Sequence, residues 1–173
     1  MPDLICHPET PSEAVRRLRV DLEEIAAGQV KLTYTLEGEI DQLALPVDAP
    51  EVHTDGLWQH TCFEAFVREK DGPAYHEYNF SPSGAWAAYS FTGYREGMTP
   101  LVIAPPKTVI KYSSTQLQLS AIISILPGAT LALSAVVEDS YREISYWALK
   151  HVVSPRPDFH HQDGFVFRLP VTW

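Results

Sequence analysis

The 173-residue chain has only two cysteines, Cys6 and Cys62, and they do not form a Cys-x-x-Cys pair. Zinc ribbons and thioredoxin-like redox sites require that spacing, so both classes are excluded. A disulfide between the two residues stays an alternative. A chain of this length can bury about 70% of the surface that its unfolded form exposes, so it needs no disulfide or metal to hold a core. We expect Cys62, which lies in an apolar and aromatic run, to be a small buried residue.

Long apolar runs and basic runs are also missing. No apolar run approaches the roughly 20 residues of a membrane-spanning helix. The N-terminus shows no basic segment followed by an apolar one, so it does not resemble a signal peptide, and we expect a cytoplasmic location. The net charge is -9. Because an acidic surface repels phosphate backbones and anionic lipids, we predict that neither nucleic acid nor membrane is a partner.

Several catalytic motifs are absent from the sequence. It contains no Gly-x-Gly-x-x-Gly or P-loop pattern, no Gly-x-Ser-x-Gly nucleophile elbow and no His-Glu-x-x-His zinc motif. These motifs position phosphates, a nucleophilic serine and a catalytic zinc. Their absence removes the usual support for a nucleotide-dependent enzyme or a serine hydrolase.

Short strands are what the sequence does contain. Fourteen prolines divide it, and apolar and polar residues alternate with period two between the turns, which is typical of strands with one buried face. The segment 11–27 is ambiguous, because residues 12–13 could cap a helix while the later residues alternate as in a strand. The other predicted strands span 30–38, 61–68, 74–80, 85–91, 108–112, 116–125, 130–138, 143–149 and 165–169.

This pattern predicts an all-β fold. Turns recur about every eight to twelve residues and the connections are short, which favours antiparallel neighbours. We therefore expect a single domain over residues 1–173 that forms an antiparallel β-sandwich of the jelly-roll or immunoglobulin-like kind. A closed barrel is the alternative.

The densest group of aromatic and polar residues lies at 57–95. Alternation places Glu64 on the less apolar face of its strand, and it places Glu77 and Asn79 together on one face of the next strand. Aromatic walls with a few convergent polar groups are typical of ligand sites. We predict a non-catalytic binding module for a small polyhydroxylated ligand, most simply a saccharide. The candidate site residues are Trp58, His60, Glu64, Glu77, Asn79, Trp86, Tyr94, Arg95, Trp147 and His160.

Two other functions fit the same residues. Glu64 and Glu77 could form the acid and base pair of an enzyme that acts on saccharides. The aromatic residues could instead pack an ordinary core in a structural or interaction domain. We predict no cofactor, with calcium as an alternative at the loop residues Asp48, Glu51 and Asp55. A transition-metal site at His151, Asp158 and His160 is a weaker alternative.

Two stretches carry a resemblance to a known family. They are Leu-Trp-Gln-His-Thr-Cys-Phe-Glu-Ala-Phe-Val at 57–67 and Tyr-His-Glu-Tyr-Asn-Phe-Ser-Pro-Ser-Gly-Ala-Trp at 75–86. An acid followed by apolar residues, a hairpin and then Asn-x-x-x-x-Gly resembles the DOMON-like superfamily, in particular bacterial proteins related to family 9 carbohydrate-binding modules. Glu64, Asn79 and Gly84 match this pattern, and the resemblance extends over nearly the whole chain.

The resemblance implies a β-sandwich with sugar or haem as ligand. Family 9 modules clamp sugar between two tryptophans, a part that Trp58 or Trp86 could take, and they often hold structural calcium. In the haem-binding relatives a methionine is paired with a histidine or lysine, which would suggest Met98 together with a histidine.

Overall fold

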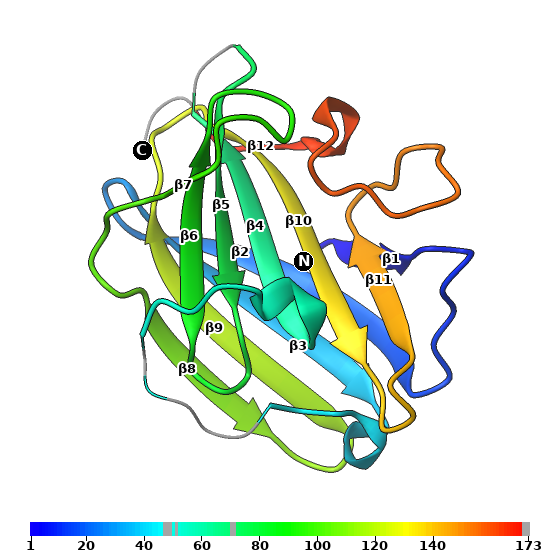
Figure 1. Ribbon diagram of the computed structural model, residues 1–173. Coiled ribbons are helices and arrows are strands. Elements are labelled where there is room, and N and C mark those ends of the chain that lie inside the picture. Colours follow the sequence, from blue (N-terminus) through cyan, green and yellow to red (C-terminus); the bar gives the residue numbers. More distant parts are fainter. Residues whose placement is uncertain (47–49, 51, 70–71, 171–173) are drawn as a thin grey trace.

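The computed structural model describes residues 1–46, 50, 52–69 and 72–170 (Figure 1). Within these residues the structure is built from twelve strands and three short 3-10 helices. The strands are β1 (Asp3–Cys6), β2 (Val15–Ala26), β3 (Gln29–Gly38), β4 (Cys62–Arg68), β5 (Tyr75–Phe80), β6 (Trp86–Phe91), β7 (Thr99–Pro100), β8 (Lys107–Tyr112), β9 (Gln116–Ser124), β10 (Thr130–Glu138), β11 (Ile144–Ala148) and β12 (Phe167–Arg168). The helices are η1 (Ile40–Gln42), η2 (Leu57–Gln59) and η3 (Gln162–Gly164).

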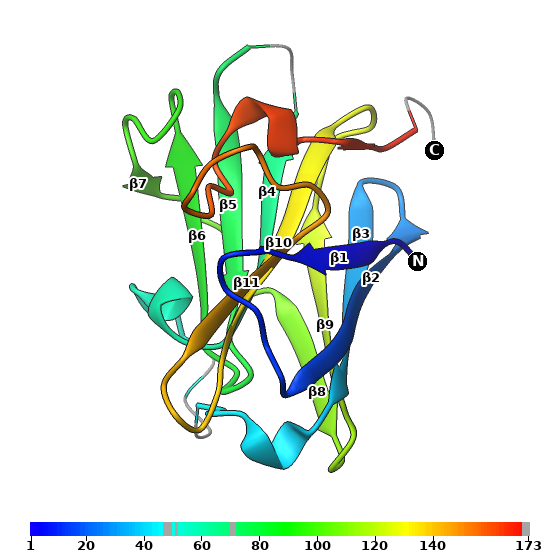
Figure 2. The ribbon, with the colours of Figure 1, turned by 90° about the vertical axis from the view of Figure 1, so that its right-hand side faces the viewer.

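All strand pairs are antiparallel and form one continuous sheet in the order β7-β6-β5-β4-β10-β11-β1-β2-β3-β9-β8, with β12 beside β10. The sheet curls into a half-barrel. Its two ends lie face to face, so that β4, β5, β6 and β10 form one layer and β2, β3, β8 and β9 form the other (Figures 1 and 2). The strand β1 pairs with both β11 and β2 and thereby joins the layers.

The main core fills the space between the two layers. Alternate residues of β3 are buried there, among them Leu32, Tyr34 and Leu36. Lys31, Thr33 and Glu37 beside them are partly exposed, whereas Thr35 is buried. The ring of Tyr34 lies 5.1 Å from that of Phe63 on the opposite layer. The Tyr34 hydroxyl donates a hydrogen bond of 2.7 Å to the backbone carbonyl of Glu64, so this buried polar group is satisfied.

A second, smaller apolar cluster lies on the other face of the β4–β5–β6–β10 layer. It consists of Phe66, Tyr75, Ala87, Tyr89, Phe91, Ala132 and Phe165, with Leu57 and Phe159 packed against it. The Tyr75 and Phe91 rings stack at 4.8 Å, and Phe165 covers Tyr75 edge-on at 5.7 Å. The segment after β11 supplies Phe159 and Phe165, so the cluster exists because this segment folds back over the sheet.

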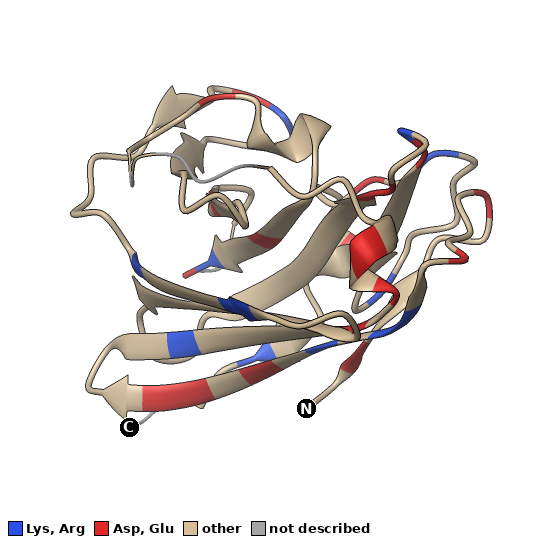
Figure 3. Cartoon of the chain, turned by 90° about the horizontal axis from the view of Figure 1, so that it is seen from below, with Lys and Arg blue, Asp and Glu red and all other residues tan. Residues whose placement is uncertain are grey.

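The outer face of the other layer is polar. Cross-strand ion pairs join Arg19 to Glu37 at 2.8 Å and Lys31 to Glu23 at 3.4 Å. Charges of both signs follow one another along the lowest strands of the view from below (Figure 3). Exposed pairs of this kind contribute little to stability, about 0–1 kcal/mol each. These charges keep the outer face in contact with solvent. The two buried clusters of aromatic residues described above lie on other faces of the sheet.

The all-β antiparallel class predicted from the sequence is confirmed, and the ambiguous segment 11–27 contains the long strand β2. The short strands β1 and β7 were not predicted. The jelly-roll and immunoglobulin-like arrangements stay predictions. Cys6 and Cys62 are free thiols, and Cys62 is buried as expected, so the alternative of a disulfide is wrong. No helix among the described residues is both long and apolar enough to span a membrane.

Candidate functional site

A cavity of about 360 Å³ opens on the face of the sheet that carries the smaller apolar cluster. Its floor comes from β4, β5 and β10, and its walls come from η2, the loop after β6 and the segment after β11. The lining residues are Trp58, Glu64, Phe66, Glu77, Phe91, Arg95, Met98, Val136, Tyr146, Pro157, Phe159 and His160.

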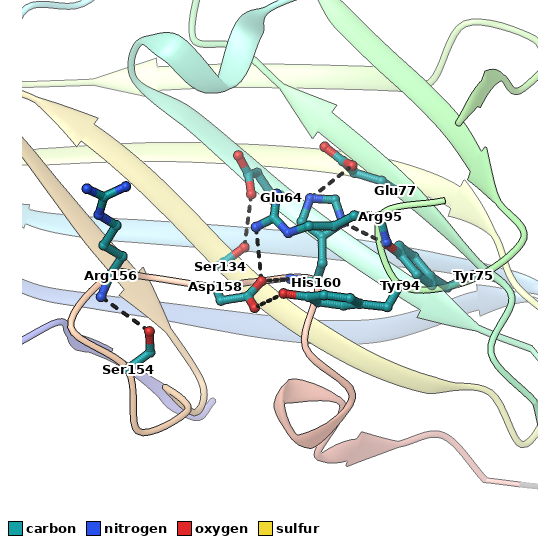
Figure 4. Close-up of polar contacts among 10 residues, drawn as sticks. All are labelled: Glu64, Tyr75, Glu77, Tyr94, Arg95, Ser134, Ser154, Arg156, Asp158 and His160. Carbon is teal, nitrogen blue, oxygen red and sulfur yellow. Dashed lines mark hydrogen bonds and ion pairs between the residues drawn. The ribbon is translucent and has the colours of Figure 1, made fainter. Parts of the chain in front are cut away.

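Strand register brings the two acids of the floor together. Glu64 lies opposite Asn79 across the β4–β5 pair, and Phe66 lies opposite Glu77. Glu64 and Glu77 are therefore diagonal neighbours on the same face, a relation that corresponds to a separation of about 7–8 Å. Both side chains extend toward the same space in front of the sheet (Figure 4). Alternation predicted this shared face correctly.

Glu64 is buried and has few partners. Ser134 on β10 donates a hydrogen bond of 3.2 Å to its Oε2, and no described residue donates one to its Oε1. Burial raises the pKa of Glu64 well above its usual range, the negative charge of Glu77 raises it further, and the bond from Ser134 acts in the opposite direction. The site thus contains a carboxyl group that favours its neutral form and has an oxygen free for a ligand.

Glu77 is also buried, and it accepts a shorter hydrogen bond than Glu64 does. The side-chain amide of Asn79 donates to its Oε1 at 2.7 Å. Burial raises the pKa of Glu77, while this bond and the charge of Arg95 oppose the rise. Asn79 is itself fully buried, and its Oδ1 has no hydrogen-bond partner among the described residues. Asn79 therefore positions Glu77 and is not a lining residue of the cavity.

His160 covers the floor from the segment after β11. Its Nδ1 lies 2.7 Å from the Tyr75 hydroxyl, and that hydroxyl accepts a hydrogen bond of 3.2 Å from the backbone N–H of Arg95. Tyr75 is thus free to donate to Nδ1, which places the imidazole proton on Nε2, 3.8 Å from Glu77 (Figure 4). Burial and the charge of Arg95 lower the pKa of His160 to about 4, against the effect of Asp158. At neutral pH this ring is uncharged.

Asp158 joins the two loops that form the rim. Its carboxylate accepts from the Tyr94 hydroxyl at 2.5 Å, from Arg95 Nη2 at 3.0 Å and from the backbone N–H of His160 at 3.2 Å. Burial alone would raise the pKa of Asp158, but the bonds from Tyr94 and Arg95 outweigh it and the pKa lies below its usual range. Arg95 therefore forms its ion pair with Asp158, and Tyr94 binds the same carboxylate at the rim of the cavity.

One tryptophan in the aromatic wall of the cavity is accessible to solvent. Trp58 in η2 is 37% exposed and contacts Tyr89 edge-on, with ring centroids 6.0 Å apart. Phe91, Tyr146 and Phe159 complete the apolar lining. Flat apolar walls with convergent polar groups can hold a ring-shaped ligand whose edge carries hydrogen-bonding groups.

A second, wider groove of about 980 Å³ lies on the other side of Trp58. It contains His60, whose Nδ1 lies 2.7 Å from Glu138 Oε2, and Arg142, which donates to Glu138 Oε1 at 3.0 Å. These bonds lower the pKa of Glu138, although burial opposes them. His60 thus lies in the neighbouring groove and not in the cavity, and Trp58 borders both.

Two of the predicted site residues face the main core instead. Trp86 is 5% exposed and Trp147 is 6% exposed, and both belong to the cluster between the layers. Trp86 lies opposite Phe80, and Trp147 lies opposite Ala135, residues that also point into that core. The expectation that Trp86 lies near Glu64 and Glu77 is therefore wrong, and a clamp of Trp58 with Trp86 cannot form around this cavity.

The metal predictions find no support in the described residues, where no three His, Cys, Asp or Glu side chains are grouped for a metal ion. Asp48 and Glu51 lie outside the described residues, so calcium stays a prediction. Asp55 accepts a hydrogen bond from Tyr89 at 2.6 Å. His151 bonds the carbonyl of Ile5 at 2.7 Å. For haem the sequence suggested Met98 with an unspecified histidine. Met98 and His160 both line the cavity, but both nitrogens of His160 have polar neighbours within the protein.

Sequence reasoning missed several residues of the site. Hydrogen bonds from Tyr75 and Ser134 position His160 and Glu64, and Tyr146 and Phe159 form part of the wall. Asp158 is predicted only as a metal ligand, whereas in the structure it joins the two loops of the rim. For Tyr75 a signal existed, because alternation places it on the face of Glu77. The other residues belong to segments that lie far from the two carboxyls in the sequence. A local sequence pattern does not predict such long-range contacts.

No protein-family model matches the chain, and neither does any curated protein. Among solved structures, a candidate carbohydrate-binding protein from Bacteroides uniformis aligns with a TM-score of 0.68 at 13% identity, over 95% of this chain and 82% of that one. A family 9 carbohydrate-binding module from Caldicellulosiruptor kristjanssonii in complex with cellotriose aligns with a TM-score of 0.47 at 11% identity, over 95% and 80%. The likeness to the first structure shows that the two chains share a fold.

Proposed function

We propose that this chain binds a saccharide, in the cavity above β4, β5 and β10. The observation that carries the proposal is the composition of the cavity: an accessible tryptophan and further aromatic walls surround two buried carboxyl groups, one of which has a free oxygen. The nonpolar faces of a sugar ring pack on aromatic side chains, while its hydroxyls exchange hydrogen bonds with carboxyl groups. A volume of about 360 Å³ lies within the range of small-molecule sites.

The shared fold supports the proposal. The structure from Bacteroides uniformis is that of a candidate carbohydrate-binding protein, and it has the same curled sheet on which this cavity is built. The predicted membership of the DOMON-like superfamily and the predicted relation to family 9 modules are part of this proposal. Among the tryptophans that the structure describes, Trp58 would supply the indole platform, because Trp86 and Trp147 lie in the main core.

Hydrolysis of a saccharide is the second candidate function. It is favoured by the separation of Glu64 and Glu77 on adjacent strands, which is within the range for glycosidase carboxyl pairs, about 5–10 Å. A glycosidase needs one carboxyl ionised and the other protonated. Here burial raises the pKa of both groups, which suits the protonated acid of such a pair but not its ionised partner. Release of nitrophenol from nitrophenyl glycosides, lost in Glu64→Gln, would establish the enzyme instead.

Replacing Trp58 with alanine should weaken saccharide binding about tenfold or more, because a ring that stacks on the indole loses its apolar platform. Titration calorimetry with a panel of mono- and trisaccharides measures the change. Trp58→Phe should retain part of the affinity. Tyr112→Ala on β8 is the matched control, because this aromatic residue is 72% exposed and does not line the cavity. If wild type binds a saccharide and Trp58→Ala binds it equally well, the ligand lies elsewhere.

A further inference from the structure

We propose that the cavity selects a ligand with a protonated amine, and that its saccharide is therefore an amino sugar. The inference rests on the proposed function and specifies its ligand. It starts from the charges of the floor, where Glu64 and Glu77 are diagonal neighbours and no described Lys or Arg forms an ion pair with either. The nearest basic group is His160, whose Nε2 lies 3.8 Å from Glu77. Buried carboxyl groups are normally paired with a cation or a metal.

The cations near the floor do not compensate the two acids. Arg95 lines the cavity, but its guanidinium is bonded to Asp158 at 3.0 Å, so the pair adds no net charge. His160 lies 3.8 Å from Glu77 and is uncharged at neutral pH, because burial and Arg95 lower its pKa to about 4. Arg68 lies over the ring of Phe165 at 4.2 Å and does not line the cavity. The floor thus keeps an excess of negative charge when its carboxyls ionise.

A protonated amine is complementary to the two carboxyl groups of the floor. An ammonium group offers three hydrogen-bond donors and no acceptor, which fits the free Oε1 of Glu64 together with Glu77 across the β4–β5 pair. Its bonds to a carboxylate are charge-assisted and stronger than those of a sugar hydroxyl. The aromatic walls, including Trp58 and Phe91, present ring faces that also attract a cation.

The same charges disfavour acidic ligands. A sugar carboxylate placed on the floor would find no free cation among the lining residues, so its charge would be buried without compensation. Any negative charge on Glu64 or Glu77 would repel it as well. The expected order of affinity at the cavity is amino sugar, then neutral sugar, then uronic acid.

Calorimetric titration of the full chain with matched sugars tests this order. We expect glucosamine and galactosamine to bind about tenfold or more tightly than glucose and galactose at about pH 6.5, where an amine is protonated. N-acetylglucosamine keeps the nitrogen without the charge and should bind like glucose. Glucuronate should bind most weakly. Equal affinity of the charged and neutral sugars would overturn the amine inference and leave saccharide binding intact; no binding by any of the sugars would overturn both.

Charge-neutralising variants locate the effect. Glu64→Gln and Glu77→Gln should each remove most of the preference for the amino sugar while changing the affinity for the neutral sugar less. Glu24→Gln, an exposed residue of β2, removes the same net charge and should leave the preference intact. Thermal unfolding of each variant checks that it is folded. A preference that survives in both cavity variants, or one that disappears in Glu24→Gln, would contradict the assignment of these two carboxyls.

Discussion

Trp147→Ala should lower the free energy of unfolding by about 3–5 kcal/mol, the usual cost of removing a large aromatic side chain from a core. Trp147 lies between the two layers at 6% exposure, and its Nε1 donates a hydrogen bond of 3.0 Å to Ser145. Trp147 is paired with Ala135 in the β10–β11 ladder, and we expect this ladder to keep the space left by the indole largely open. Urea unfolding followed by circular dichroism at neutral pH measures the loss.

The comparison with Trp58→Ala separates the two kinds of tryptophan. Trp58 is 37% exposed and borders both the cavity and the wider groove, so its replacement should cost only about 1 kcal/mol. The variants should thus have opposite profiles, with Trp147→Ala affecting stability and Trp58→Ala affecting ligand binding. A small stability loss in Trp147→Ala together with a loss of saccharide affinity would contradict the placement of this residue in the core.

Glu64→Gln should be more stable than the wild type at pH 7, by about 1–3 kcal/mol, because folding raises the pKa of Glu64 and an amide has no ionisation to suppress. The amide keeps an oxygen that accepts the bond from Ser134, and it cannot ionise. Each unit by which folding raises the pKa of the Glu64 carboxyl corresponds to about 1.4 kcal/mol in the free energy of unfolding.

The sign of the pH dependence follows from the direction of that shift. Folding raises the pKa of Glu64, so the stability that its neutral form contributes is fully present below the unfolded value of 4.5 and is lost as the pH rises through the folded value. The advantage of Glu64→Gln should accordingly vanish near pH 4 and grow toward pH 7. Urea unfolding at both pH values tests this, with Glu24→Gln as control. An equal gain at both pH values would show that the effect does not come from ionisation.

Strand alternation was enough to predict the face that carries the carboxyls. The strand at 61–68 has one uniformly apolar side, with Phe63 and Ala65, and this side is the one that packs between the layers. Glu64 must then lie on the other side, because successive side chains point to opposite faces. The same rule groups Glu77 with Asn79, so the floor of the site could be predicted from the sequence.

The position of Trp86 could not be predicted in the same way. The face that a strand presents depends on its register with the neighbouring strand, and register in a hairpin is set by the geometry of the turn. Here Phe80 pairs with Trp86 across a turn that includes Gly84 at a φ of 94°, so both rings point into the main core. The segment that covers the site could not be predicted either. Asp158 and His160 contact the loop after β6 and the strand β5, respectively, which are more than sixty residues away in the sequence.

The indole N–H signals in a proton–nitrogen NMR spectrum give the most direct test of saccharide binding at this cavity. During titration with the saccharide that binds most tightly by calorimetry, the signal of Trp58 should shift, whereas those of Trp86 and Trp147 should stay in place. Trp58→Phe assigns the signal. A saccharide that binds while the Trp58 indole stays unchanged, or a panel in which no saccharide binds, would contradict the proposed function.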